Sequence, residues 1–69
     1  MEFSERLEKI IKEKKLSKSQ ASRKCNIGEA HFYKIARGET KPMLDIIIRI
    51  CMGLDVQPND LIPGPWNLD

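Results

Sequence analysis

Cysteine, histidine and long apolar runs are all scarce in this sequence of 69 residues, and each scarcity excludes a class of function. The two cysteines belong to no CxxC motif and no Cys/His cluster, so we expect no bound metal. The single histidine has no nucleophile at a recognisable spacing, and the sequence has no glycine-rich phosphate loop. We therefore expect no enzyme activity, no cofactor and no small-molecule substrate. Apolar runs such as Ile46-Ile47-Ile48 are too short to cross a bilayer.

The cysteine count also bears on the cellular compartment. Cys25 and Cys51 allow one disulfide on number alone, but both occupy inward helical positions, where a thiol serves as a small core hydrophobe. Two lone cysteines, with no apolar stretch behind the N-terminal Met-Glu-Phe-Ser, are typical of a reduced cytosolic protein. We expect one compact cytoplasmic domain with no membrane contact.

Charge is distributed unevenly along the chain. Residues 1–41 hold eleven Lys and Arg against six Asp and Glu, a balance of +5, whereas residues 42–69 hold one Arg against four Asp, a balance of −3. A small domain with one basic end has a preferred face for polyanions. The same lysines also fit the solvated face of a helix, so charge alone leaves both interpretations open.

Apolar residues at helical spacing predict a helical domain, with no strand alternation anywhere. The first helix has Ser4 placed to cap its start, and its apolar stripe is Phe3, Leu7, Ile10 and Ile11. In the second helix, Ser17 and Gln20 have the spacing of a capping box, in which each side chain bonds the backbone amide of the other residue. The inward residues of this helix are Ala21 and Cys25. Asn26 then tolerates the left-handed conformation that a tight turn needs.

Three further helices are predicted beyond this turn. The third runs from residue 29 to 37, with Gly28 as a permissible cap and Gly38 as its stop, and its inward residues are Phe32 and Ile35. A loop over residues 39–42 leads to a fourth helix, whose stripe is Leu44, Ile47, Ile50, Cys51 and Leu54. Pro58 opens a short fifth helix to residue 62. A tail, residues 63–69, carries Trp66.

Two short helices joined by a turn of about three residues are typical of the helix-turn-helix motif. The sequence here resembles the Xre-type repressors, the five-helix domains of the phage Cro and repressor kind, at Leu16-Ser17, Ala21-Ser22, Ile27, Phe32, Ile35, Arg37-Gly38, Pro42, Ile47, Cys51, Leu54 and Leu61. The resemblance covers about residues 3–62 and is most specific from residue 16 to 42. It implies an all-α, five-helix, lambda-repressor-like domain over residues 1–62, followed by the short tail.

The resemblance also implies a partner, double-stranded DNA, with the recognition helix of residues 28–37 in the major groove. By family position, the residues toward base edges are Gly28, Glu29, Ala30, Tyr33 and Lys34. The residues at phosphate positions are Ser17, Lys18, His31, Arg37 and Lys41. For His31, an ordinary surface position is the alternative. Lys18 offers an ammonium where the family often has a glutamine.

A small transcriptional repressor of this kind acts by occupancy, and we expect a homodimer whose two half-sites lie about 34 Å apart, one turn of DNA. The apolar residues beyond a single core stripe are Met43, Ile46 and Ile48. They fit either a dimer patch or ordinary partial burial.

Four residues besides Lys18 depart from the family pattern: Ala21-Ser22 stands where Leu-Ala is usual, Asn26 replaces the turn glycine, and Ala36 replaces a frequent glutamate. The N-terminal end of the recognition helix, residues 28–30, has no amide or guanidinium side chain to hydrogen-bond a purine. Glu29 can nevertheless accept a hydrogen bond from cytosine, and Ala30 can touch a thymine methyl. The alternative function is therefore a protein-contact module such as an antitoxin, an antirepressor or a partner-binding subunit. A continuous basic surface around residues 18, 34, 37 and 41 would favour DNA.

Overall fold

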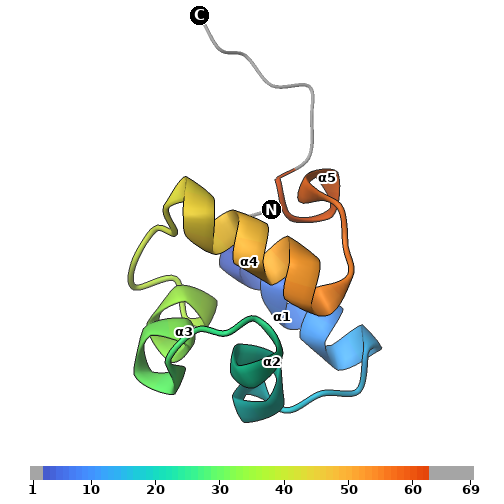
Figure 1. Cartoon of the computed structure of the whole chain (residues 1–69), viewed down its shortest axis with the longest axis horizontal. Coiled ribbons are helices and arrows are strands. Elements are labelled where there is room, and N and C mark those ends of the chain that lie inside the picture. Colours follow the sequence, from blue (N-terminus) through green and yellow to red (C-terminus); the bar gives the residue numbers. More distant parts are fainter. Residues whose placement is uncertain (1–2, 63–69) are drawn as a thin grey trace, which may run out of the picture.

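The computed structural model describes residues 3–62, and these residues form helices and no strands (Figure 1). The helices are α1 (Phe3–Glu13), α2 (Lys18–Lys24), α3 (Glu29–Ala36), α4 (Leu44–Leu54) and α5 (Pro58–Leu61). The predicted all-α, five-helix fold is thus confirmed. The predictions about the tail and Trp66 fall outside the described residues. Within residues 3–62, no helix is long and apolar enough to cross a membrane.

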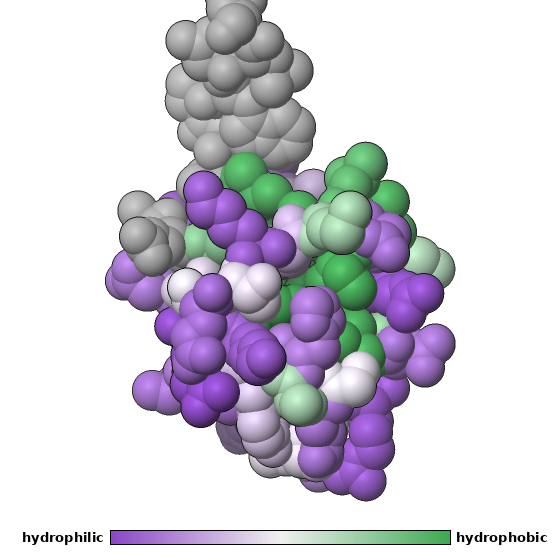
Figure 2. Space-filling view, turned by 90° about the vertical axis from the view of Figure 1, so that its left-hand side faces the viewer, coloured by the Kyte–Doolittle hydropathy of each residue, from purple (hydrophilic) through white to green (hydrophobic). Residues whose placement is uncertain are grey.

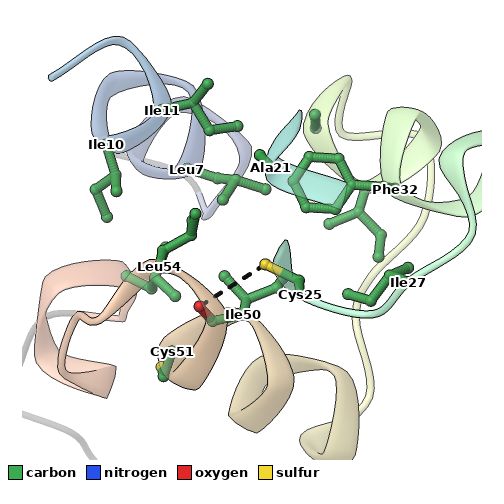
Figure 3. Close-up of a cluster of buried hydrophobic side chains, with 13 residues drawn as sticks. Leu7, Ile10, Ile11, Ala21, Cys25, Ile27, Phe32, Ile50, Cys51 and Leu54 are labelled. Atoms are coloured by element: carbon green, nitrogen blue, oxygen red, sulfur yellow. Dashed lines mark hydrogen bonds between the residues drawn. The ribbon is translucent and has the colours of Figure 1, made fainter. Parts of the chain in front are cut away.

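The core lies where α1, α2, α3 and α4 converge, as Figure 3 shows. The apolar stripe of α1 is confirmed, since Leu7, Ile10 and Ile11 are buried and Phe3 packs against them. Through this stripe α1 packs against α3 and α5, while α2 packs against α3 and α4. The prediction that Ser4 caps α1 is wrong, because the helix already includes Phe3 and Ser4 lies in its first turn.

The helix-turn-helix segment is fixed by local hydrogen bonds. The capping box of α2 is confirmed: the Gln20 amide donates to Ser17 Oγ at 3.0 Å, and the Ser17 amide donates to Gln20 Oε1 at 2.9 Å. Asn26 has a φ of 57°, the left-handed conformation expected for the turn. The hydroxyl of Ser22, which is fully buried, donates to the carbonyl of Ser19 at 2.8 Å. The polar side chain in the seam between α2 and α3 is therefore satisfied within its own helix.

Helix α4 contacts the helix-turn-helix motif at its turn and at the end of α2. The Arg49 guanidinium donates to the carbonyl oxygen of Asn26 at 3.2 Å, so α4 binds the turn between α2 and α3 directly. Gly53 allows the end of α4 to approach the end of α2, because a Cβ at this position would lie 2.6 Å from the Lys24 carbonyl oxygen. Helix α4, which lies outside the motif, therefore stabilises the position of the turn between α2 and α3.

Two helix boundaries and the burial of one residue differ from the sequence predictions. Helix α3 ends at Ala36, one residue early, with Arg37 as its C-cap, and Gly38 confirms the predicted stop with a φ of 78°. Helix α5 ends at Leu61, not at residue 62. Leu44 was placed in the apolar stripe of α4, but it is 73% exposed. The buried residues of α4 all lie in its C-terminal half, and the helix packs mainly against α2 and α5.

Both cysteines lie in the core, as predicted, and neither forms a disulfide. The Cys25 thiol contacts the carbonyl oxygen of Ile50 at 3.9 Å (Figure 3). Burial, with a smaller contribution from neighbouring Cys51, raises the pKa of Cys25 to about 11. Burial also raises the pKa of Cys51, with Asp60 adding to the shift. Both groups therefore behave as protonated core side chains at neutral pH.

Candidate nucleic-acid interface

The outer face of α3 is polar and open to solvent, while its inner face is buried through Phe32, Ile35 and Ala36. Of the ten residues predicted to contact DNA, those that are exposed are Ser17, Gly28, Glu29, Ala30, His31, Lys34, Arg37 and Lys41. Lys18 and Tyr33 are half-buried. The fold therefore presents the predicted residues on the start of α2, on the outer face of α3 and on the loop that follows it.

Tyr33 and Lys34 differ in how firmly they are held. The Tyr33 side chain packs against the buried core cluster, which fixes the ring at the edge of the exposed face of α3. Lys34 is exposed, and no carboxylate in the described part of the chain pairs with it. A fixed aromatic ring beside a free ammonium is suited to contact with base edges or phosphates.

The start of α2 carries a paired cation. Lys18 Nζ lies 2.8 Å from Glu8 Oε1, so an ion pair joins α2 to α1. The two side chains are 42% and 34% exposed, and they line one shallow groove together with Arg37. Ser17 is exposed beside them, but its Oγ already accepts the capping hydrogen bond of α2. The start of α2 therefore presents the Lys18 ammonium with the Glu8 carboxylate next to it.

The end of α3 also carries a cation that is paired with a carboxylate. Arg37 Nε lies 2.9 Å from Glu39 Oε2, in an ion pair whose side chains are 57% and 52% exposed. Lys41, farther along the loop, is exposed and has no ion pair within residues 3–62. The basic surface predicted from Lys18, Lys34, Arg37 and Lys41 is thus exposed in most of its parts, and two of its four cations are paired.

Glu29, in the first turn of α3, is hydrogen-bonded to a residue of α2. Its carboxylate accepts a short hydrogen bond from the Ser19 hydroxyl, and Arg23 Nη2 lies 3.4 Å from the same hydroxyl oxygen. This chain of polar groups joins the first turns of the two motif helices. One carboxylate oxygen of Glu29 is held by Ser19, which leaves the other to accept from a base.

Sequence reasoning missed four residues of this surface: Glu8, Ser19, Arg23 and Glu39. Glu39 follows Arg37 by two positions, so its pairing has a local signal in the sequence. Glu8 and Lys18 come from different helices, and their contact depends on how α1 packs beside α2. No pattern of spacing within one helix indicates such a pair.

A second exposed surface is apolar. Its residues are Met43, Leu44, Ile48, Met52 and Ile62, which we call the α4 patch. Figure 2 shows the end of the molecule that holds α3 and the loop before α4, where hydrophilic residues cover most of the surface and hydrophobic residues gather to one side. Leu44, Ile48 and Met52 are four residues apart along α4 and so share one face of the helix. Exposed apolar side chains gathered in this way mark contact surfaces.

Comparison with known proteins agrees with this geometry. The family model described as the Cro/C1-type HTH DNA-binding domain matches residues 6–63, so the chain belongs to the Cro/C1-type helix-turn-helix DNA-binding family. Its structure is similar to the crystal structure of the restriction-modification controller protein C.AhdI from Aeromonas hydrophila, with a TM-score of 0.81. The two share 24% sequence identity over 86% of this chain and 89% of that one. No curated protein matches the sequence.

Proposed function

We propose that this protein is a small transcriptional regulator that binds specific sites in double-stranded DNA through α3. One observation carries the proposal: a family DNA-binding domain presents an exposed face on its recognition helix, with Lys34 unpaired at its centre. In helix-turn-helix domains this helix enters the major groove, N-terminal residues toward the bases. The domain that does this extends over residues 1–62, with residues 63–69 as a tail.

The proposed contacts divide into two kinds. Phosphate contacts come from Ser17 and Lys18 at the start of α2, from Arg37 and Lys41 around the end of α3, and from His31 on its exposed side. These contacts position the domain without reading sequence. The residues proposed to face base edges are Gly28, Glu29, Ala30, Tyr33 and Lys34. The free oxygen of Glu29 suits a cytosine amino group, and Ala30 suits a thymine methyl.

The regulator is proposed to act as a homodimer that represses by occupying a two-fold related operator. The α4 patch supports this, because a second copy of the same apolar surface would cover it, as an isologous dimer requires. The patch belongs mainly to α4, whereas the residues proposed to contact bases belong to α3 and its N-cap, so a dimer formed through the patch would use a different helix from the one proposed to bind DNA. Half-sites spaced by about one helical turn, roughly 34 Å, would then receive one α3 each.

A selection from random duplex DNA tests the proposal. The protein is incubated with a randomised duplex pool at about 0.1 M salt, where non-specific contacts are still strong enough to retain a weak binder. Bound duplexes are recovered, amplified and sequenced through successive rounds. Enrichment of a two-fold related motif supports the proposal. If the protein retains no duplex even at low salt, the DNA-binding function fails, and the α4 patch then favours a protein-contact module.

A further inference from the structure

Two of the three lysine and arginine side chains assigned to phosphates, Lys18 and Arg37, are already paired with carboxylates of the same chain. Glu8 holds Lys18 and Glu39 holds Arg37, at 2.8 and 2.9 Å, whereas Lys34 and Lys41 have no such partner among residues 3–62. We propose that Glu8 and Glu39 compete with DNA phosphates for these two cations, and that they thereby lower the affinity of the interface for every duplex. The inference rests on the proposed DNA-binding function.

Both ion pairs are suited to exchange because they are accessible to an incoming ligand. Their four side chains are between 34% and 57% exposed, although the Glu8 Oε1 atom that faces Lys18 is itself buried. Partly exposed pairs of this kind contribute little to the stability of the fold. Neither pair belongs to the buried core, which consists of apolar side chains and Ser22. A phosphate oxygen can therefore replace the carboxylate without disturbing the packing of α1, α2 and α3.

The two ion pairs also lie at the same groove. Glu8, Lys18 and Arg37 line the same groove between α1, α2 and the end of α3, and Glu39 joins Arg37 from the loop. Glu5 lines this groove as well, so an approaching phosphate meets two cations and three carboxylates, with a formal charge of −1 in total. The unpaired cations, Lys34 and Lys41, then supply most of the net attraction for the DNA backbone.

Competition of this kind has a measurable consequence. When Lys18 turns to a phosphate, it gives up its ion pair with Glu8, and the loss of that pair opposes DNA binding. For unit charges about 4 Å apart in water, the interaction corresponds to about a fivefold change in an equilibrium constant. A cation that stays paired also neutralises less than one phosphate, so it releases fewer counterions from the DNA. The wild-type salt slope should therefore be smaller than three phosphate contacts, from Lys18, Arg37 and Lys41, imply.

The test compares three isosteric variants of the full chain, Glu8→Gln, Glu39→Gln and the control Glu13→Gln. Glu13 is exposed at the end of α1, five residues after Glu8, and has no ion pair among residues 3–62, so its variant makes the same charge change without freeing a cation. Binding to a random-sequence duplex is measured by fluorescence anisotropy across a range of salt concentrations. Circular dichroism establishes that all three variants are folded.

We expect Glu8→Gln and Glu39→Gln each to bind the random duplex about fivefold tighter than the wild type at about 0.1 M salt. Each should also steepen the salt slope, by up to about 0.9 for each phosphate newly neutralised. Glu13→Gln should change affinity by less than about twofold, because Glu13 pairs with no cation in the described part of the chain and its exposed charge is screened by salt. In the Lys18→Ala background, Glu8→Gln should bring no gain in affinity over Lys18→Ala alone, since the gain acts through the freed ammonium.

Three results would overturn the inference. If Glu8→Gln and Glu39→Gln behave like Glu13→Gln, DNA binding stands but the carboxylates do not compete with phosphate. If the gain from Glu8→Gln survives in the Lys18→Ala background, it reflects net charge and not release of Lys18. If neither the wild type nor any variant binds duplex at low salt, the proposed function itself fails and the inference fails with it.

Discussion

Gly53 and Lys24 approach so closely that a Cβ on Gly53 would lie 2.6 Å from the carbonyl oxygen of Lys24. The same Cβ would also lie 2.7 Å from Cys25 Cα, so both obstructing atoms belong to the backbone of the chain at the end of α2. Backbone atoms cannot turn aside as a flexible side chain can. The absence of a side chain at residue 53 is therefore what lets α4 close on the motif.

Replacing Gly53 with alanine should destabilise the protein by about 2 kcal/mol, because the cost of overpacking exceeds the gain of about 1 kcal/mol that alanine brings within a helix. Urea unfolding followed by circular dichroism measures this change. Gly28→Ala is the matched control, since a Cβ at Gly28 would meet nothing within 4 Å. The control should cost less than about 1 kcal/mol, the usual loss at a helix N-cap. Equal stability of the two variants would contradict the close approach.

The Cys25 thiol should make stability depend on pH in the alkaline range. Its pKa is raised from 9.0 to about 11 in the folded protein, so folding disfavours the thiolate. The unfolded chain loses this proton first, and the free energy of unfolding should therefore fall as pH rises from 9 to about 11. The loss is on the order of 2 kcal/mol.

Other groups titrate in the same range, so the comparison is with Cys25→Ala. The variant starts less stable, because it leaves a cavity in the core. Its stability should nevertheless decline less between pH 8 and pH 11 than that of the wild type. Parallel curves for the two proteins would show that the thiol is not the group responsible.

The features that could be predicted from the sequence are those with a local cause. Phe32 and Ile35 follow from helical spacing, the capping box from Ser17 and Gln20, and the end of α3 from Gly38. The ion pair of Glu8 with Lys18 has no such cause, because its partners meet only after α1 and α2 have packed. The same holds for the bond from Arg49 to Asn26, which joins residues 23 positions apart.

Leu44 shows why periodicity alone misassigned one residue. It lies three positions before Ile47 and so continues the apolar stripe, but burial depends on a neighbouring element as well as on helical phase. Residues of α4 are buried only toward its C-terminal half. The same geometry that exposes Leu44 creates the α4 patch, which the sequence indicated only through the surplus of apolar residues at Met43 and Ile48.

A charged residue in the α4 patch should weaken the proposed dimer. Ile48→Glu places a carboxylate in the patch, and burying it without a partner across an interface is costly. Sedimentation equilibrium should show a concentration-dependent dimer for the wild type and a monomer for the variant at the same concentrations. Gln20→Glu is the control, since it adds the same charge on α2 and preserves the capping-box pattern. A wild type that stays monomeric with and without duplex would contradict the dimer.

The most direct test of DNA recognition by α3 compares Lys34→Ala with Arg37→Ala on the selected duplex and on a random one. Lys34→Ala should cost on the order of 1–3 kcal/mol on the selected site and much less on random DNA. Arg37→Ala should weaken both complexes alike and lower the salt slope by at most about 0.9. Lys14→Ala, which removes a charge near α5, should alter neither. Equal losses for Lys34→Ala on both duplexes would contradict base recognition by α3.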